Sequence, residues 1–361
     1  MSVSRAVRVW SPVVLLALVT ALSGCAAAVP AETPRASASA SPTPTPTVTP
    51  ATAPSVRVPA TCDQLVPQDV VDAAFRVSVE PVHPQHPRSP GTYADERAGV
   101  LTCSWSSDEV GPSVASGAVY GWVTVVPDAT RADVDDMLAG LMFGDHEPLS
   151  AVPDTASSCS ATFFQWCGFL AYADRYSVIG GVWDYGDATF ESQRKAIEAL
   201  ASASVPVVRA LAVPEPLWQP QGVTLTGATE CDGMLTNAQI ESITGWTGVH
   251  PAKSDGGENA VSTLRTNARV HSYLCEWTAD QADAGLSASV LPGGASYATA
   301  TRPADSVDVA GLGDAAFRSA GDDSLDVIAA TGWVQVASGW LSDDALIALA
   351  RQELANVGYT G

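Results

Sequence analysis

The sequence is poor in basic side chains and has no long apolar run. Its 361 residues contain 18 lysines and arginines against 39 aspartates and glutamates, which gives a formal net charge of −21. A surface this acidic repels the phosphates of nucleic acids and the anionic head groups of membranes. We therefore expect no nucleic-acid partner. No segment reaches the about 18 consecutive apolar residues that a membrane-spanning helix needs, so we expect no such helix.

Common catalytic and metal-binding motifs are also missing. The sequence has no Gly-x-Ser-x-Gly, no His-Glu-x-x-His and no phosphate-binding loop. His83 and His86 are spaced for zinc, but three prolines surround them and no third ligand is evident. Two acidic clusters lack the alternating ligands and the glycine turn of a calcium loop. They comprise Asp133, Asp135 and Asp136, and Asp322, Asp323 and Asp326. We predict no catalytic residue, no metal, no cofactor and no enzymatic activity.

The N-terminal residues have the pattern of an export signal. Arg5 and Arg8 precede an apolar run, 13–22, that is too short to span a bilayer. The run ends in Leu22-Ser23-Gly24-Cys25, which resembles the lipobox of a bacterial lipoprotein. That resemblance implies removal of the signal peptide 1–24 and lipidation of Cys25, with palmitate among the acyl chains. We therefore expect the protein on the outer face of the cytoplasmic membrane, anchored through the lipid on Cys25.

The residues that follow Cys25 have a composition that cannot build a core. Residues 25–58 are rich in proline, threonine, serine and alanine and show no periodic apolar pattern. Repeated Thr-Pro favours an extended polyproline conformation. We predict a disordered stalk between the membrane anchor and the folded part of the chain.

Beyond the stalk the sequence contains an internal duplication. Each copy opens with a Cys-Asp pair at a short helical pattern, and each later has a Cys-x-Trp motif, namely Cys103-Ser104-Trp105 and Cys275-Glu276-Trp277. A hairpin pattern and a closing amphipathic helix follow in both copies. We predict two α+β domains, 59–212 and 222–361, joined by the proline-rich linker 213–221. Each domain is expected to be an antiparallel sheet of about four to five strands with helices packed on one face.

The duplication also selects a pairing for the cysteines. Six cysteines remain besides Cys25, which is an even number in a chain that is expected to be exported. Equivalent positions in the two copies predict the disulfides Cys62–Cys103 and Cys231–Cys275. Cys159 and Cys167 are then left to pair with each other.

One loop carries a cluster of aromatic residues. Phe163, Phe164 and Trp166 lie between Cys159 and Cys167, so a disulfide would staple them into a loop tip. They are the candidate contact surface of the chain. The alternative is that these rings pack back over the sheet.

Taken together, these features resemble a known type of protein. The lipobox, the stalk, the cysteine at the first helix and the Cys-x-Trp strand are similar to those of actinobacterial cell-envelope lipoproteins of uncharacterised function. They are also similar to the extracellular sensor domains of some mycobacterial serine/threonine kinases. The resemblance implies no catalytic residues. We expect a lipid-anchored binding or scaffold module whose partner is an envelope glycan, lipid or protein. Two alternatives remain, a lipid or glycolipid carrier with an apolar cavity and a cell-wall polymer hydrolase.

Overall fold

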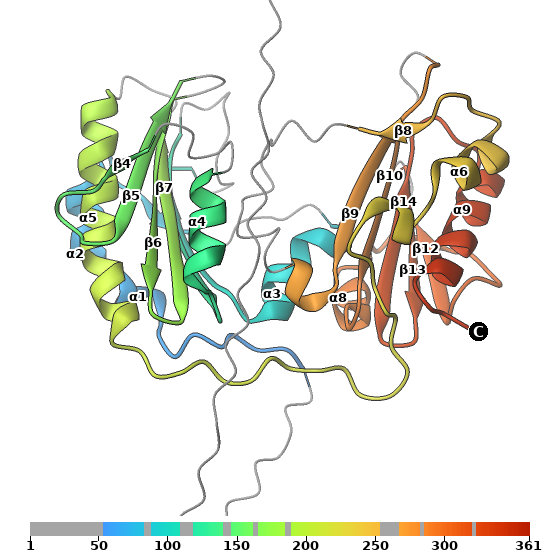
Figure 1. Cartoon of the computed structure of the whole chain (residues 1–361), viewed down its shortest axis with the longest axis horizontal. Coiled ribbons are helices and arrows are strands. Elements are labelled where there is room, and N and C mark those ends of the chain that lie inside the picture. The colour runs from blue at the N-terminus through green and yellow to red at the C-terminus, as the bar shows by residue number, and fades with distance from the viewer. Residues whose placement is uncertain are drawn as a thin grey trace, which may run out of the picture. The chain divides into compact units, whose positions relative to one another are not determined.

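Two antiparallel sheets with helices on their faces make up the fold (Figure 1). The computed structural model describes residues 53–82, 88–108, 118–139, 146–161, 165–184, 189–252, 267–281, 285–319 and 323–361. Residues 50–361 belong to one compact unit. Several sequence predictions fall outside the described residues, namely those on the signal peptide 1–24, Cys25, most of the stalk, His83, His86, Phe163, Phe164 and Asp322.

The first sheet is built from the first copy of the duplication. Its described strands run in the order β1-β2-β3-β7-β6-β5-β4, and every neighbouring pair is antiparallel. The bounds are β1 (Glu80–Pro81), β2 (Leu101–Ser106), β3 (Val119–Pro127), β4 (Glu147–Pro148), β5 (Thr155–Ser160), β6 (Trp166–Ala173) and β7 (Tyr176–Asp184).

The second sheet repeats this topology strand for strand. Its order is β8-β9-β10-β14-β13-β12-β11, again antiparallel throughout. The bounds are β8 (His250–Pro251), β9 (Tyr273–Thr278), β10 (Gly285–Leu291), β11 (Val307–Asp308), β12 (Ala315–Arg318), β13 (Ser324–Ala329) and β14 (Gly332–Ala337). The predicted α+β class is confirmed. Each sheet has seven described strands rather than four to five, because the two-residue edge strands are too short to show an alternating pattern.

Long helices cover one face of each sheet. In the first copy α5 (Phe190–Arg209) packs on β6 and β7, with α1 (Cys62–Leu65) and α2 (Gln68–Ala74) beside it. In the second, α9 (Asp343–Asn356) packs on β13 and β14, with α6 (Asn237–Thr244) and the short η3 (Cys231–Gly233) nearby. Thr189 and Ser342 begin the two long helices as N-caps, because their hydroxyls accept from backbone N–H groups of the first turn.

The opposite faces carry shorter helices. On the first sheet, α4 (Arg131–Ala139) buries Val134 and Met137 against β6 and β7. On the second sheet, η1 (Pro90–Tyr93) contacts β9, β10 and β14, although it belongs to the first copy. It continues into α3 (Ala94–Ala98), and α8 (Ala295–Ala300) also lies on this sheet. The Arg88 guanidinium fixes the segment by donating to the Asp326 carboxylate of β13 at 2.5 Å.

The second copy contributes to the first in the same way. Residues 267–270 are helical and precede β9 as α3 precedes β2. Within this turn Arg269 donates to the Asp133 carboxylate of α4 at 3.2 Å, and Val270 packs in a cluster with Val126 and Met137. Each copy therefore lends a segment to the other, which the sequence pattern did not predict.

Three disulfides staple the fold, and they are the predicted pairs. Cys62–Cys103 and Cys231–Cys275 each tie the start of a copy to its second strand, with a Cα–Cα distance of 5.5 Å in both. Cys159–Cys167 joins β5 to β6 at a Cα–Cα distance of 4.1 Å. Both long bridges lie at the cores under the long helices, where they constrain equivalent points of the two copies.

Candidate binding face of the first sheet

Four aromatic residues share one face at one end of the first sheet. Tyr120 of β3 and Trp166 of β6 are both register partners of Trp183 on β7, and Trp122 lies two residues beyond Tyr120. Partners in register point to the same side of a sheet, whereas their sequence neighbours point to the other. Those neighbours, such as Cys167, belong to the core under α5. The four aromatic side chains therefore lie on the face opposite α5, and we call them the aromatic face.

Three rings of this face are in mutual contact. Ring centroids are 5.8 Å apart for Tyr120 and Trp122, 5.7 Å for Tyr120 and Trp183, and 5.3 Å for Trp122 and Trp183. These separations fall in the range that aromatic pairs favour. Tyr120 is buried, whereas Trp122, Trp166 and Trp183 are half-buried. The cluster therefore keeps indole surface in contact with solvent.

Two glycines make room for the indole rings. Gly168 and Gly181 are register partners on the aromatic face. A Cβ on Gly181 would collide with the ring of Trp122, and one on Gly168 would collide with the ring of Trp166. Both rings thus lie close against the backbone of the sheet, and only glycine permits this approach.

Serines flank the aromatic face on both sides. Ser104 and Ser106 of β2 are register partners of Trp122 and Tyr120. On the far side, two serines of β5 lie in register with β6; they are Ser158 and Ser160. The Tyr120 hydroxyl donates to the Ser104 hydroxyl oxygen at 3.0 Å, and burial raises the pKa of Tyr120, so the phenol stays protonated at neutral pH. The five central strands, as far as they are described, carry no charged side chain on this face.

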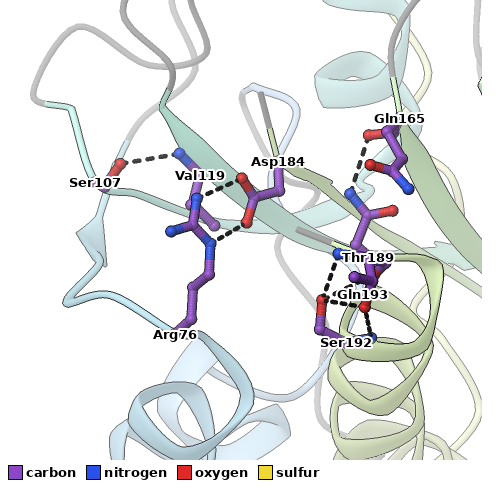
Figure 2. Close-up of polar contacts among 8 residues, drawn as sticks. All are labelled: Arg76, Ser107, Val119, Gln165, Asp184, Thr189, Ser192 and Gln193. Atoms are coloured by element: carbon purple, nitrogen blue, oxygen red, sulfur yellow. Dashed lines mark hydrogen bonds and ion pairs between the residues drawn. The ribbon is translucent and has the colours of Figure 1, made fainter. Parts of the chain in front are cut away.

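Polar contacts hold the strand ends that carry the rings. Figure 2 shows the Arg76 guanidinium facing the Asp184 carboxylate, with N–O distances of 2.7 and 2.8 Å. Asp184 directly follows Trp183 and is 4% exposed, so this paired contact fixes the end of β7. The Gln193 side-chain amide of α5 donates to the Gln165 carbonyl at 3.1 Å, which fixes the residue before Trp166.

Two further contacts complete the same frame. The Val119 backbone N–H donates to the Ser107 hydroxyl at 2.9 Å, and this closes β2 against β3 beside Tyr120. Thr189 and Ser192 form reciprocal side-chain to backbone bonds at the first turn of α5. The ends of four strands and one helix are thereby fixed around the aromatic face.

The aromatic face includes one of the predicted contact residues. Trp166 lies over the sheet, as one alternative held, and it is also half-buried on the face away from the long helices. Trp122 and Trp183 fall in strand patterns typical of core residues, but both are half-buried. Alternation of Tyr120 with Trp122 and the paired Gly180-Gly181 were the available signals for an aromatic surface.

The same face of the second sheet is covered and contains a buried polar network beside the apolar rings of Phe317 and Trp333. The Asp326 carboxylate accepts from Arg88 and, at 2.9 Å each, from the Trp333 indole and the Gln335 amide. Asp326 is fully buried, and this burial raises its pKa although three donors oppose the shift. Asp326 belongs to an acidic run in the sequence, but its carboxylate accepts hydrogen bonds inside the fold rather than facing solvent.

Neither known proteins nor metal-binding or membrane-spanning elements add a functional assignment to these contacts. No protein family, curated protein or solved structure matches this chain. Within the described ranges, no group of three or more His, Cys, Asp or Glu residues is placed to hold a metal ion. None of the described helices is long and apolar enough to span a bilayer. The aromatic face is therefore the feature of the described chain on which a binding site is best argued.

Proposed function

We propose that this chain is a lipid-anchored, extracytoplasmic binding module of the cell envelope, without enzymatic activity. The lipid on Cys25 would hold it at the outer face of the cytoplasmic membrane, and residues 25–58 would act as the stalk. The folded copies would then present the aromatic face to other components of the envelope.

The pairing of the cysteines is the observation that carries this proposal. Six of the seven cysteines are joined in three disulfides, which persist in oxidising compartments outside the cytoplasm. Because all six partners are used, no cysteine of the chain remains to pair with Cys25. Its thiol is therefore available for a thioether to a diacylglyceryl group, as the lipobox resemblance implies.

The aromatic face supports the binding part of the proposal. Exposed indole surface next to hydroxyls is suited to contact with a ligand, and aromatic side chains are enriched at binding sites. Its rings are held by fixed strand ends, so little ordering would be needed on binding.

Membrane fractionation of a Cys25→Ala variant tests the anchor. The unaltered chain is expected in the membrane fraction, with a mass that includes a diacylglyceryl group and excludes residues 1–24. Cys25→Ala should lose that lipid mass and leave the membrane fraction, whereas the stalk variant Ser39→Ala should behave like the unaltered chain. Equal membrane retention of Cys25→Ala, or an unaltered chain without added lipid, would contradict the proposal.

A further inference from the structure

We infer that the aromatic face binds a neutral glycan. This inference deepens the proposed function and rests on it, because the envelope location brings the face into contact with polysaccharide. It commits the site to Trp122, Trp166 and Trp183 as the stacking surface and to Ser160, the one half-buried serine of the four that flank the rings, as its polar border.

The second copy provides an internal control for the role of the rings. Cys103 and Cys275 are equivalent, and their register partners are Val123 and Ala288. Counting back from these partners, Trp122 corresponds to Ser287 and Tyr120 to Gly285. The same strand order thus forms without the β3 aromatic residues, so the fold itself does not require them.

Strand β7 shows the same difference. The hairpins Ala173–Tyr176 and Ala329–Gly332 align the two copies, and Trp183 then corresponds to Gly339. Three of the four rings are therefore additions of the first copy. The second copy forms the same fold without these rings. Contact with a ligand therefore explains them better than packing does.

The chemistry of the face selects the ligand class. An indole ring has a negative face that attracts the polarised C–H groups on the flat side of a sugar ring. Serine hydroxyls both donate and accept, as sugar hydroxyls do. Ser160 is half-buried next to Trp166, so the polar border reaches solvent there.

Charge argues for a neutral ligand. The strand positions of this face carry no cation among the described residues, and the whole chain has a formal charge of −21. A phosphorylated or carboxylated polymer would be repelled and would find no counter-charge on these strands. The frame of Figure 2 pairs Arg76 with Asp184, so this guanidinium is already engaged.

The test is calorimetric titration of the full chain, purified in detergent, with neutral oligosaccharides of glucose, mannose, galactose and arabinose. Trp122→Ser copies the second-copy residue Ser287, and Trp122→Phe keeps a smaller stacking ring. The control Trp340→Ala removes an indole that is 64% exposed in the second copy. We expect at least one oligosaccharide to bind, and Trp122→Ser to weaken its Kd about tenfold or more. The Kd of Trp122→Phe should lie between those of the unaltered chain and Trp122→Ser. Trp340→Ala should bind like the unaltered chain.

Three results would overturn the inference. They are the absence of binding by every neutral oligosaccharide, binding that Trp122→Ser and Trp122→Phe leave unchanged, and binding of phosphatidylcholine vesicles by the detergent-free Cys25→Ala chain that Trp122→Ser abolishes. Membrane fractionation of the same preparations reads the proposed anchor separately. A chain that is lipidated but binds no glycan contradicts only this inference, whereas a chain that binds glycan without lipid contradicts only the anchor.

Discussion

The two sheets share one topology, yet the face opposite the long helix leaves indole rings half-buried in the first copy and is covered in the second. In the first copy this face exposes indole rings at one end and is covered by α4 at the other. In the second copy η1 covers it, and its centre is the buried Asp326 network. The strand order is thus compatible with either surface. What the copies have in common is the apolar core beneath the long helix, and that core defines the fold.

One buried position of the long helices carries a carboxyl group in the second copy only. Counting from the N-caps Thr189 and Ser342, Leu200 of α5 corresponds to Glu353 of α9. Both side chains are fully buried, but neither carboxylate oxygen of Glu353 has a hydrogen-bond partner. The second core therefore contains a destabilising group where the first has leucine, and this contrast can be tested by exchange.

The largest effect is expected at the buried ion pair of the second copy. Asp326→Ala leaves the Arg88 guanidinium, whose side chain is 14% exposed, without its carboxylate. We expect unfolding free energy measured in urea to fall by about 3 to 5 kcal/mol. The double variant Arg88→Met with Asp326→Leu, which copies the apolar Leu170 of the first sheet, should lose far less. An equal loss in both variants would contradict this account of the pair.

Removing disulfides should distinguish the long bridges from the short one. Cys231→Ala with Cys275→Ala opens a link of sequence separation 44, and the loop-entropy model gives a loss of about 4 kcal/mol. Cys159→Ala with Cys167→Ala opens a separation of 8, for which the same model gives about 2.5 kcal/mol. Urea midpoints under non-reducing conditions measure both. The reverse ranking would show that native-state strain outweighs chain entropy.

Exchanging the buried glutamate should stabilise the second copy. Burial raises the pKa of Glu353 well above its ordinary value of 4.5. The folded state therefore binds a proton that the unfolded state releases, and stability falls as the pH rises from about 4.5 towards the folded-state pKa. Glu353→Leu, which copies Leu200, should raise the unfolding free energy at pH 7 by about 2 kcal/mol.

The pH dependence provides the control for that variant. Glu353→Gln should also flatten the decline of stability above pH 4.5, because it removes the titrating group. Glu191→Gln changes an exposed glutamate of α5 and should leave the decline unchanged. A parallel decline in Glu353→Leu and the unaltered chain would show that another group causes it.

The smallest effects are expected at the N-caps of the long helices. Thr189→Ala and Ser342→Ala each remove a hydroxyl that accepts from a backbone N–H of the first turn. Each should lower the unfolding free energy by about 1 kcal/mol. Threonine and serine restore the bond in either position, so Thr189→Ser and Ser342→Thr should be close to neutral in thermal unfolding.

Prediction from sequence succeeded where the duplication repeated a local pattern. The Cys-x-Trp strands, the hairpins and the closing helices recur in both copies, and each repeat constrained the other. The Thr236 capping box and the left-handed Gly245 at the ends of α6 are local features of the same kind.

Long-range contacts could not be predicted in this way. Nothing near Arg88 in the sequence indicates that it pairs with Asp326, which is 238 residues away. Asp326 lies among other acidic residues and reads as solvent-exposed, although the structure buries it. For the aromatic face, the sequence indicates that the rings lie in strands. The side of the sheet on which they lie depends on a register that only the structure defines.

The most direct test of the account follows the indole N–H signals of the full chain in detergent during titration with the oligosaccharide that binds best. If the copies differ in function through the faces opposite their long helices, the signals of Trp122, Trp166 and Trp183 should shift in proportion to occupancy. Signals of the second-copy indoles should stay in place; these belong to Trp246, Trp277, Trp333 and Trp340. Shifts confined to the second copy, or shifts spread equally over both, would contradict the assignment of binding to the first sheet.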